Sequence, residues 1–296
     1  MQSTKIKESL SAKIFNIANI VFMFLLMILA LYPMIYILFA SLSSHTLLMA
    51  HKGPILWPLG FSLHTYKAVF QDPMILSGYM NTLFIVVAGV LLNILMTALG
   101  AYFLSRKGPM WTKQITVFII FTMYFSGGLI PFYLVVTGMG LENNLLALIL
   151  PTAINTFNLI IMRTAFESIP VSMEESARLD GAGDFAILFK IIMPLSMSTI
   201  AVMILYYAVG HWNSWFNAMV FIRDSKLYPL QLVLRSILIS NDTTSMTQNT
   251  SIEFQESISE TVKYAVIIVA TLPILAAYPF LQKYFVKGVM IGAVKG

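Results

Sequence analysis

The sequence predicts an all-α integral membrane protein with six transmembrane helices. Three observations predict this fold: a composition poor in charge, six long uncharged stretches, and an uneven distribution of lysine and arginine. Of the 296 residues, 58% are hydrophobic and only 10% are charged, whereas soluble domains carry about 25% charged residues. This composition excludes an ordinary soluble enzyme, a disordered chain and a nucleic-acid-binding protein. The absence of cysteine excludes disulfides and Cys-ligated metal sites.

Six uncharged stretches are long enough to cross a bilayer, which takes roughly 20 apolar residues. The predicted spans are 15–40, 79–104, 115–137, 143–163, 198–221 and 264–284. The first span is too long for the core of a cleaved signal peptide, about 7–15 residues, and no A-x-A cleavage site follows it. We therefore expect all six spans to remain in one transmembrane domain covering residues 1–296.

The basic residues predict the orientation, because cytoplasmic loops carry an excess of lysine and arginine. Twelve of the 18 basic residues fall on one side: Lys5, Lys7, Lys13, Arg106, Lys107, Lys113, Arg163, Arg178, Lys190, Lys283, Lys287 and Lys295. The other six are Lys52, Lys67, Arg223, Lys226, Arg235 and Lys263. Both termini are therefore expected in the cytoplasm, as an even number of spans requires.

Several classes of membrane protein are disfavoured. No Asp, Glu, Lys or Arg lies in the interior of a span, and such residues usually mark ion-coupled transport. The chain has no H-E-x-x-H zinc motif, no G-x-S-x-G nucleophile motif and no phosphate-binding G-x-x-x-x-G-K-[ST] loop. We therefore expect no catalysis, no metal site and no nucleotide in this chain itself.

The loop 164–197 between the fourth and fifth spans carries the clearest local signals. Ser172 and Glu175 have capping-box spacing, which predicts a helix from about Met173. Gly181 predicts a left-handed residue that ends this helix.

A second amphipathic helix is expected from about Phe185, with four apolar residues on one side: Phe185, Leu188, Phe189 and Ile192. Pro194 ends or kinks it. The sequence of the loop therefore predicts two short helices joined by a sharp glycine turn on the cytoplasmic face.

This loop resembles the EAA loop of permease subunits in binding-protein-dependent ABC importers, E-A-A-x3-G-x9-I-x-L-P. The matching residues here are Glu175, Ser176, Ala177, Gly181, Ile191, Met193 and Pro194. Ser176 replaces the middle alanine and Met193 replaces the leucine. Three further segments resemble sugar permeases: Asp180-Gly181-Ala182, Trp212–Phe216, and the tail from Gln282 to Gly288. The resemblance is to the MalG-like carbohydrate-uptake class and its LplC/YtcP-like subgroup.

The resemblance implies that the loop docks on a separate ATPase subunit, which alone binds ATP and Mg. The implied coupling residues are Glu174, Glu175, Ser176, Ala177, Arg178, Asp180, Gly181, Ala182 and Pro194. Two interpretations stay open for Glu175, a helix cap and a contact with the ATPase. Arg178 is either a solvated loop charge or a partner for an acidic ATPase residue.

Amides and aromatic rings in the spans are candidates for a sugar path, because sugars stack on rings and hydrogen-bond to amides. The candidates are Trp212, Asn213, Trp215, Asn217, Asn155 and Asn158. Asn213 and Asn217 are four residues apart and would share one helix face. The alternative is that the polar residues hold helices together and that the tryptophans anchor the membrane interface.

The resemblance implies a subunit that forms half of the path of an ATP-driven importer for oligosaccharides, with a hint of uronic polysaccharide fragments. The implied partners are a second six-span permease, two ATPase subunits and an extracytoplasmic sugar-binding protein in a prokaryotic cell membrane. The alternatives are an ABC permease for peptide, phosphate or polyamine, an ion-coupled carrier or channel, and a membrane enzyme.

Overall fold

The computed structural model describes residues 9–106, 108–244, 261–276 and 279. These residues form helices, turns and loops, with one isolated bridge between Ser43 and Phe61, so the described chain confirms the all-α prediction. The chain divides into two compact units, Met1–Gln71 with Leu238–Val269, and Asp72–Ile237 with Ala270–Gly296.

Unit 1 contains α1 (Leu10–Ser41), α2 (His45–Ala50) and α3 (His64–Gln71). Unit 2 contains α4 (Pro73–Ser105), α5 (Thr112–Tyr124), α6 (Leu129–Gly138), the 3₁₀ turns η1 (Leu145–Leu148) and η2 (Leu150–Thr152), α7 (Thr156–Glu167), α8 (Val171–Leu179), α9 (Asp184–Ile187), the π-helical turn η3 (Leu188–Ile192), α10 (Met193–Leu195), α11 (Met197–Trp212), α12 (Phe216–Phe221) and the 3₁₀ turn η4 (Ser225–Leu227). Both units contribute residues to α13 (Leu230–Thr244) and to an apolar helix over Thr261–Ala276.

In unit 1, α1 is apolar around its whole circumference and its long central part is exposed. A helix of this kind suits a lipid environment rather than water. Only its end is packed, where Ala40 joins Leu48 and Ile55 in a small core. The Ser41 and Tyr66 hydroxyls share a hydrogen bond of 2.7 Å, which fastens this end of α1 to α3.

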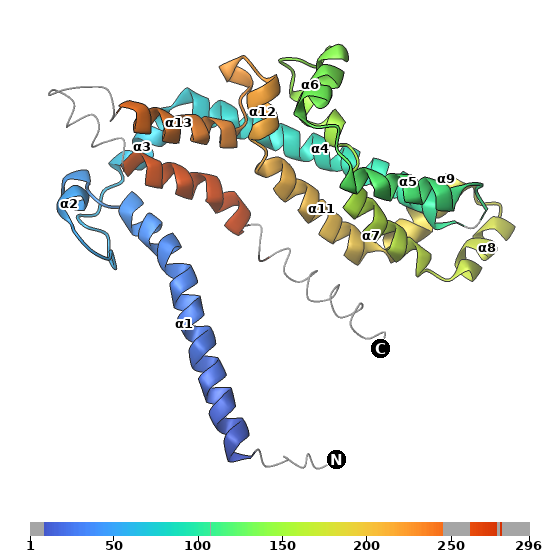
Figure 1. The fold of residues 1–296 in the computed structure, drawn as a ribbon, viewed down its shortest axis with the longest axis horizontal. Helices are drawn as coiled ribbons and strands as arrows, with labels where there is room; N and C mark the ends of the chain where they lie inside the picture. The colour runs from blue at the N-terminus through green and yellow to red at the C-terminus, as the bar shows by residue number, and fades with distance from the viewer. Residues whose placement is uncertain (1–8, 107, 245–260, 277–278, 280–296) are drawn as a thin grey trace. The chain divides into compact units, whose positions relative to one another are not determined.

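In unit 2, α4 is the central element, and α7 and α11 run along it (Figure 1). Helix α4 has a well-defined start, because the Asp72 carboxylate accepts a hydrogen bond from the Met74 N–H at 2.8 Å and Pro73 occupies the first turn. Small residues such as Ala98 and Ala101 allow α7 and α11 to approach closely, and Phe166 and Met203 fill the space between the helices.

Buried polar side chains along α4 pair with residues more than 50 positions away. The Asn93 amide oxygen accepts a hydrogen bond from Nε2 of His211 at 2.7 Å, and the Asn93 amide N–H donates to the Thr152 carbonyl at 2.6 Å. Thr97 shares a hydrogen bond with the Tyr207 hydroxyl at 2.7 Å. Because no water is present in the hydrocarbon core, such groups must be satisfied within the protein.

The length and composition of the helices confirm part of the six-span prediction. Helices α1 and α4 are each long and apolar enough to cross a membrane, and up to five crossings result if each bent helix pair counts as one. The predicted sixth span, 264–284, is described only as far as residue 276 and at residue 279. The count of six therefore stays a prediction.

The third, fourth and fifth predicted spans are not continuous helices. Between α5 and α6 the chain turns by 115°, and between η2 and α7 by 47°. The fifth predicted span, 198–221, is interrupted because α11 ends at Trp212 and α12 begins at Phe216. A hydropathy average over a whole span does not detect these breaks, since the few polar and glycine residues at them, Ser126 to Gly128, Asn155, and Asn213 with Ser214, are outweighed by the apolar helices on both sides.

We predict that Gly89→Ala lowers the stability of unit 2. An added Cβ would lie 2.5 Å from Nε2 of His211, which is held by Asn93 and cannot move freely. The expected loss is about 1–3 kcal/mol, as for other overpacked cores, measured as a lower midpoint of thermal unfolding in detergent. The control is Gly210→Ala on α11, where an added Cβ has no neighbour within 4 Å. Equal midpoints for the two variants would contradict the prediction.

Candidate functional site

Helix α8 is the first helix of the predicted coupling loop, and it begins earlier than the sequence suggests. It starts at Val171, directly after Pro170, and no side chain caps its first turn. The predicted capping box of Ser172 and Glu175 is therefore wrong, because both residues already lie inside the helix. Instead, Glu174 in the first turn and Arg178 in the last turn complement the helix dipole.

The predicted glycine turn after α8 is confirmed. Gly181 has φ +83°, a left-handed conformation that favours glycine. Its N–H donates to the Arg178 carbonyl at 3.0 Å, and the Ala182 N–H donates to the Ala177 carbonyl at 2.9 Å. These two bonds define a Schellman motif, so the direction of the chain after α8 is set by backbone geometry.

The second helix of the loop is irregular. It begins at Asp184 in α9, passes through the π-helical turn η3 and ends in α10 at Leu195. After Ser196 the chain continues as α11 at an angle of 87°. Pro194 lies inside α10, just before this bend, which agrees with the expected kink.

The predicted apolar face of this second helix is only half right. Leu188 and Ile192 are buried as expected, together with Ile187. Phe185 and Phe189 are exposed instead. The buried side of this helix is centred on Ile187 and Leu188, so the Phe185 and Phe189 rings lie outside the buried side.

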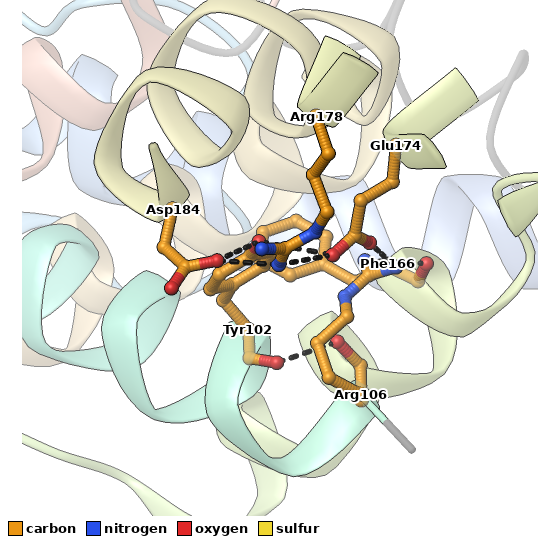
Figure 2. Close-up of polar contacts among 7 residues, drawn as sticks. Tyr102, Arg106, Phe166, Glu174, Arg178 and Asp184 are labelled. Atoms are coloured by element: carbon orange, nitrogen blue, oxygen red, sulfur yellow. Dashed lines mark hydrogen bonds and ion pairs between the residues drawn. The ribbon is translucent and has the colours of Figure 1, made fainter. Parts of the chain in front are cut away.

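A cluster of charges joins α8 to the end of α4 (Figure 2). The Glu174 side chain is buried, with 9% of its surface exposed, and its Oε2 lies 2.7 Å from Nη1 of Arg106. Its Oε1 lies 2.9 Å from Nη2 of Arg178, which also pairs with Asp184 at the start of α9. Figure 2 shows these four side chains converging with the Tyr102 ring from α4.

Further contacts complete the cluster. The Tyr102 hydroxyl donates to Glu174 at 3.3 Å, and Nη2 of Arg106 donates to the Phe166 carbonyl at 3.3 Å. The Arg106 guanidinium lies 5.0 Å from the centre of the Tyr102 ring. Hydrogen bonds from Arg178 to Glu174 and Asp184 raise the pKa of the Arg178 guanidinium, so it stays charged at every physiological pH.

The structure separates the predicted coupling residues into an inner and an outer set. Glu174 and Ala177 face inward. Glu175, Ser176, Arg178, Asp180 and Gly181 are exposed, as is Pro194. In the part of the chain that the structure describes, Glu175 makes no side-chain hydrogen bond or ion pair, which leaves it available to another protein.

Sequence reasoning missed Tyr102, Arg106 and Asp184 in this cluster. Arg106 is the first charge after a long uncharged run, which indicates a helix end. Its partner is 68 positions away, and no spacing rule connects the two.

The predicted sugar-path residues fall into different environments. Trp212 is buried, and its ring N–H donates to the Ala270 carbonyl at 3.2 Å. Asn158 is also buried, whereas Asn155 is exposed and caps α7 by accepting the Asn158 N–H at 3.1 Å. The Asn155 side chain therefore has a clear structural role as the cap of α7.

Asn213 and Asn217 do not share a helix face, which corrects the spacing argument. Asn213 is the C-terminal cap of α11 and donates to the Val209 carbonyl at 3.0 Å. Asn217 belongs to α12, beyond the break. It lines a hollow of about 550 Å³ together with Ser126 to Leu129, Pro131, Phe132, Val135 and Phe216.

Residues 97–291 match the family described as "Binding-protein-dependent transport system inner membrane component". The match covers most of the chain, and the chain belongs to this family. It is therefore a permease subunit of ABC transporters, as the loop motif indicated.

Two curated relatives come from Bacillus subtilis (strain 168). The chain is 39% identical to the polygalacturonan/rhamnogalacturonan transport system permease protein YtcP, over 96% of this chain and 99% of the relative. It is 41% identical to protein LplC, over 97% and 96%. Among solved structures, it is similar to a chain of a bacterial ABC transporter involved in the import of the acidic polysaccharide alginate. The TM-score is 0.86 at 35% identity, covering 95% of this chain and 100% of that one.

We predict that Gly181→Ala weakens the turn between α8 and α9. A side chain in the left-handed region costs about 1–2 kcal/mol, so the loop should open more often and be cut faster by a protease added to the detergent-solubilised protein. The control is Gly183→Ala, at φ −77° and with open space around the position. Equal cleavage rates for the two variants would argue against this role of the turn.

We predict that Arg106→Gln lowers stability more than Arg178→Gln. Loss of Arg106 removes the closest charge from a buried carboxylate, and such a loss costs about 3–5 kcal/mol, reduced here because Arg178 remains. Arg178 is 49% exposed, and exposed pairs contribute about 0–1 kcal/mol. Thermal unfolding of both variants in the same detergent measures the difference, and the reverse order would refute the inner position of Arg106.

Proposed function

We propose that this permease imports oligosaccharides that carry carboxylate groups, and that it couples to a separate ATPase through the loop 164–197. The substrate class is supported by the names of two proteins to which the chain is similar. One belongs to a polygalacturonan/rhamnogalacturonan transport system, and the other to an importer of the acidic polysaccharide alginate. Both polymers contain uronic acids.

The observation that carries the coupling proposal is the two-sided construction of α8. Its inner side is fixed to α4 through Glu174 and Arg106. Leu179, the last residue of α8, is 90% exposed, and Phe185, which follows the glycine turn, is 71% exposed. Large apolar side chains on a polar loop mark a protein-binding surface. We define Leu179, Phe185, Met173 and Glu175 as the docking face.

This arrangement suits the transmission of a force. A partner that binds the docking face pushes on a helix whose inner side is attached by ion pairs to the end of a span. The hollow of about 1050 Å³ beside the cluster is lined by residues of α4, α7, α8 and α9, and it provides space for the side chains of a partner. The ATPase would supply ATP and Mg, and this chain would supply only the mechanical connection.

The remaining parts of the proposal concern the assembly. The chain would form one half of the path, as a single transmembrane domain with both termini in the cytoplasm, beside a second six-span permease. Two ATPase subunits would bind the cytoplasmic loops, and an extracytoplasmic binding protein would deliver the sugar. The basic residues of the sequence support this orientation.

We predict that Leu179→Asp separates the permease from its ATPase. A mild-detergent pull-down of the tagged wild-type chain from its native membrane should recover an ATPase and a second permease, identified by mass spectrometry. The variant should lose the ATPase but keep the second permease, because a charge replaces an apolar contact on the docking face only. Trp57→Asp, a similarly exposed ring on the predicted opposite side of the membrane, is the control and should keep both partners.

Two outcomes would refute the proposal. Recovery of the wild-type chain alone, or as a homo-oligomer, would exclude the importer assembly. Recovery of the ATPase at the wild-type level with Leu179→Asp would exclude the docking face while leaving the importer in place.

A further inference from the structure

Arg235 on α13 differs from every other arginine of the chain. The other four, Arg106, Arg163, Arg178 and Arg223, each form an ion pair with a carboxylate. Among the residues that the structure describes, Arg235 has no carboxylate partner. Its guanidinium carbon lies 4.6 Å from the centre of the Trp215 ring, and Nη1 lies 3.0 Å from the Met219 sulfur.

The Trp215 ring that Arg235 covers stands at the break between α11 and α12. It is 37% exposed, and the neighbouring Phe216 ring is 42% exposed. The two rings meet edge to face, with their centres 5.6 Å apart. Two aromatic surfaces next to a cation therefore remain accessible in an interrupted part of the membrane domain.

The surface continues from Phe216 into the hollow of about 550 Å³ at Asn217. The opposite wall is the break between α5 and α6, where Ser126, Gly127 and Gly128 form no helix. Interrupted helices at membrane depth are tolerated where they are buried in protein or line a cavity, and in transporters they commonly form binding sites. The hollow is within the size range of ligand pockets, about 300–1,000 Å³.

The chemistry of the surface formed by Arg235, Trp215, Phe216 and Asn217 matches a uronic sugar. A guanidinium pairs with a carboxylate through two parallel hydrogen bonds. The Trp215 ring covers the Arg235 guanidinium, and the contact of Nη1 with the Met219 sulfur involves a weak acceptor that a carboxylate would replace. Aromatic rings accept the apolar face of a pyranose, and an amide such as Asn217 bonds to hydroxyl groups. A neutral sugar would use the rings and the amide, but it would offer Arg235 only hydroxyl oxygens and not the charge-assisted pair that a carboxylate forms.

We propose that Arg235, Trp215, Phe216 and Asn217 form a binding subsite for one uronic residue of the transported oligosaccharide, with Arg235 holding its carboxylate. This proposal rests on the proposed function, which it deepens by naming the residues that select acidic substrates. Arg235 is one of the basic residues on the predicted extracytoplasmic side, where an incoming sugar arrives first.

A structural role for the Arg235–Trp215 pair and a role in binding anionic lipid are the competing explanations. A structural pair would affect all substrates equally when it is broken. A lipid phosphate would be bound by the same guanidinium, so that uptake of acidic and neutral sugars would change together with the lipid composition. A substrate carboxylate alone predicts an effect that depends on the charge of the sugar.

The test uses the complete importer, with both permeases and both ATPases in vesicles, together with its binding protein. The probes are trigalacturonate and its carboxyl-reduced, neutral counterpart, supplied to separate samples. Arg235→Gln should raise KM for trigalacturonate by about ten- to hundredfold, the effect of losing a charge-assisted hydrogen bond, and should leave KM for the neutral trisaccharide unchanged. Arg235→Met, which keeps the apolar contact with Trp215, should behave in the same way, whereas Arg235→Lys should recover part of the loss.

The matched control is Arg223→Gln, which removes an exposed arginine that already pairs with Glu142. It should change neither KM. Co-purification of the second permease with each variant verifies that the assembly forms, and Arg235→Met decides the question if Arg235→Gln does not assemble. The measurements are repeated in vesicles with and without anionic lipid.

Each other outcome overturns the subsite. Equal changes for both sugars would assign Arg235 a structural role, and an effect present only with anionic lipid would assign it to a headgroup. Unchanged kinetics with both sugars would remove Arg235 from the path while carbohydrate import stands. Wild-type uptake of the neutral sugar only would exclude the uronic substrate but not the importer. If the wild type takes up neither sugar, the proposed function fails and the subsite fails with it.

Discussion

The buried carboxylate of Glu174 connects the predicted coupling loop to the end of α4. Two arginines neutralise it from opposite sides, Arg106 at the end of α4 and Arg178 on its own helix. If both arginines were lost, an unpaired charge would remain buried, at a cost of about 3–5 kcal/mol out of a total stability of about 5–15 kcal/mol. Since α7 and α11 pack along α4, this one carboxylate ties the orientation of the coupling loop to the three-helix centre of unit 2.

In the interior of unit 2, buried neutral polar groups must likewise find partners within the protein. Where the fourth predicted span is irregular, the Tyr207 hydroxyl accepts a hydrogen bond from the Asn155 N–H at 3.1 Å, and the Asn93 side-chain amide donates one to the Thr152 carbonyl. These contacts satisfy the Asn155 N–H and the Thr152 carbonyl, two backbone groups at the point where the chain leaves the helical conformation. The breaks are thus supported structures, and the one next to Trp215 leaves aromatic surface open rather than closing it.

Local rules predicted what depends on local chemistry. The Gly181 turn follows from the backbone preference of one residue, and the long helices α1 and α4 follow from composition. The capping box failed because Ser172 and Glu175 matched the pattern, whereas the helix starts two residues earlier, directly after Pro170. The break after Trp212 is marked only by Asn213 and Ser214, turn-favouring residues in a long apolar segment without proline at the break. The contact between Arg106 and Glu174 was missed because the two residues are 68 positions apart, whereas the i,i+4 pair of Glu174 and Arg178 is one that helix spacing could have predicted.

The distribution of the arginines separates two tasks that a transport subunit must perform. Coupling requires rigidity, and the arginines near the loop are all occupied by carboxylates of the chain, so that a push on the loop is not lost in side-chain rearrangement. Selection of an anion requires a cation whose hydrogen bonds are not already taken. The Trp215 ring can hold Arg235 in place, because the aromatic face stabilises the charge while no carboxylate among the described residues pairs with the guanidinium, whose Nη1 meets the weakly accepting Met219 sulfur. An arginine paired with a carboxylate of the chain can therefore hold two helices together, whereas an arginine beside an aromatic ring can bind an external anion.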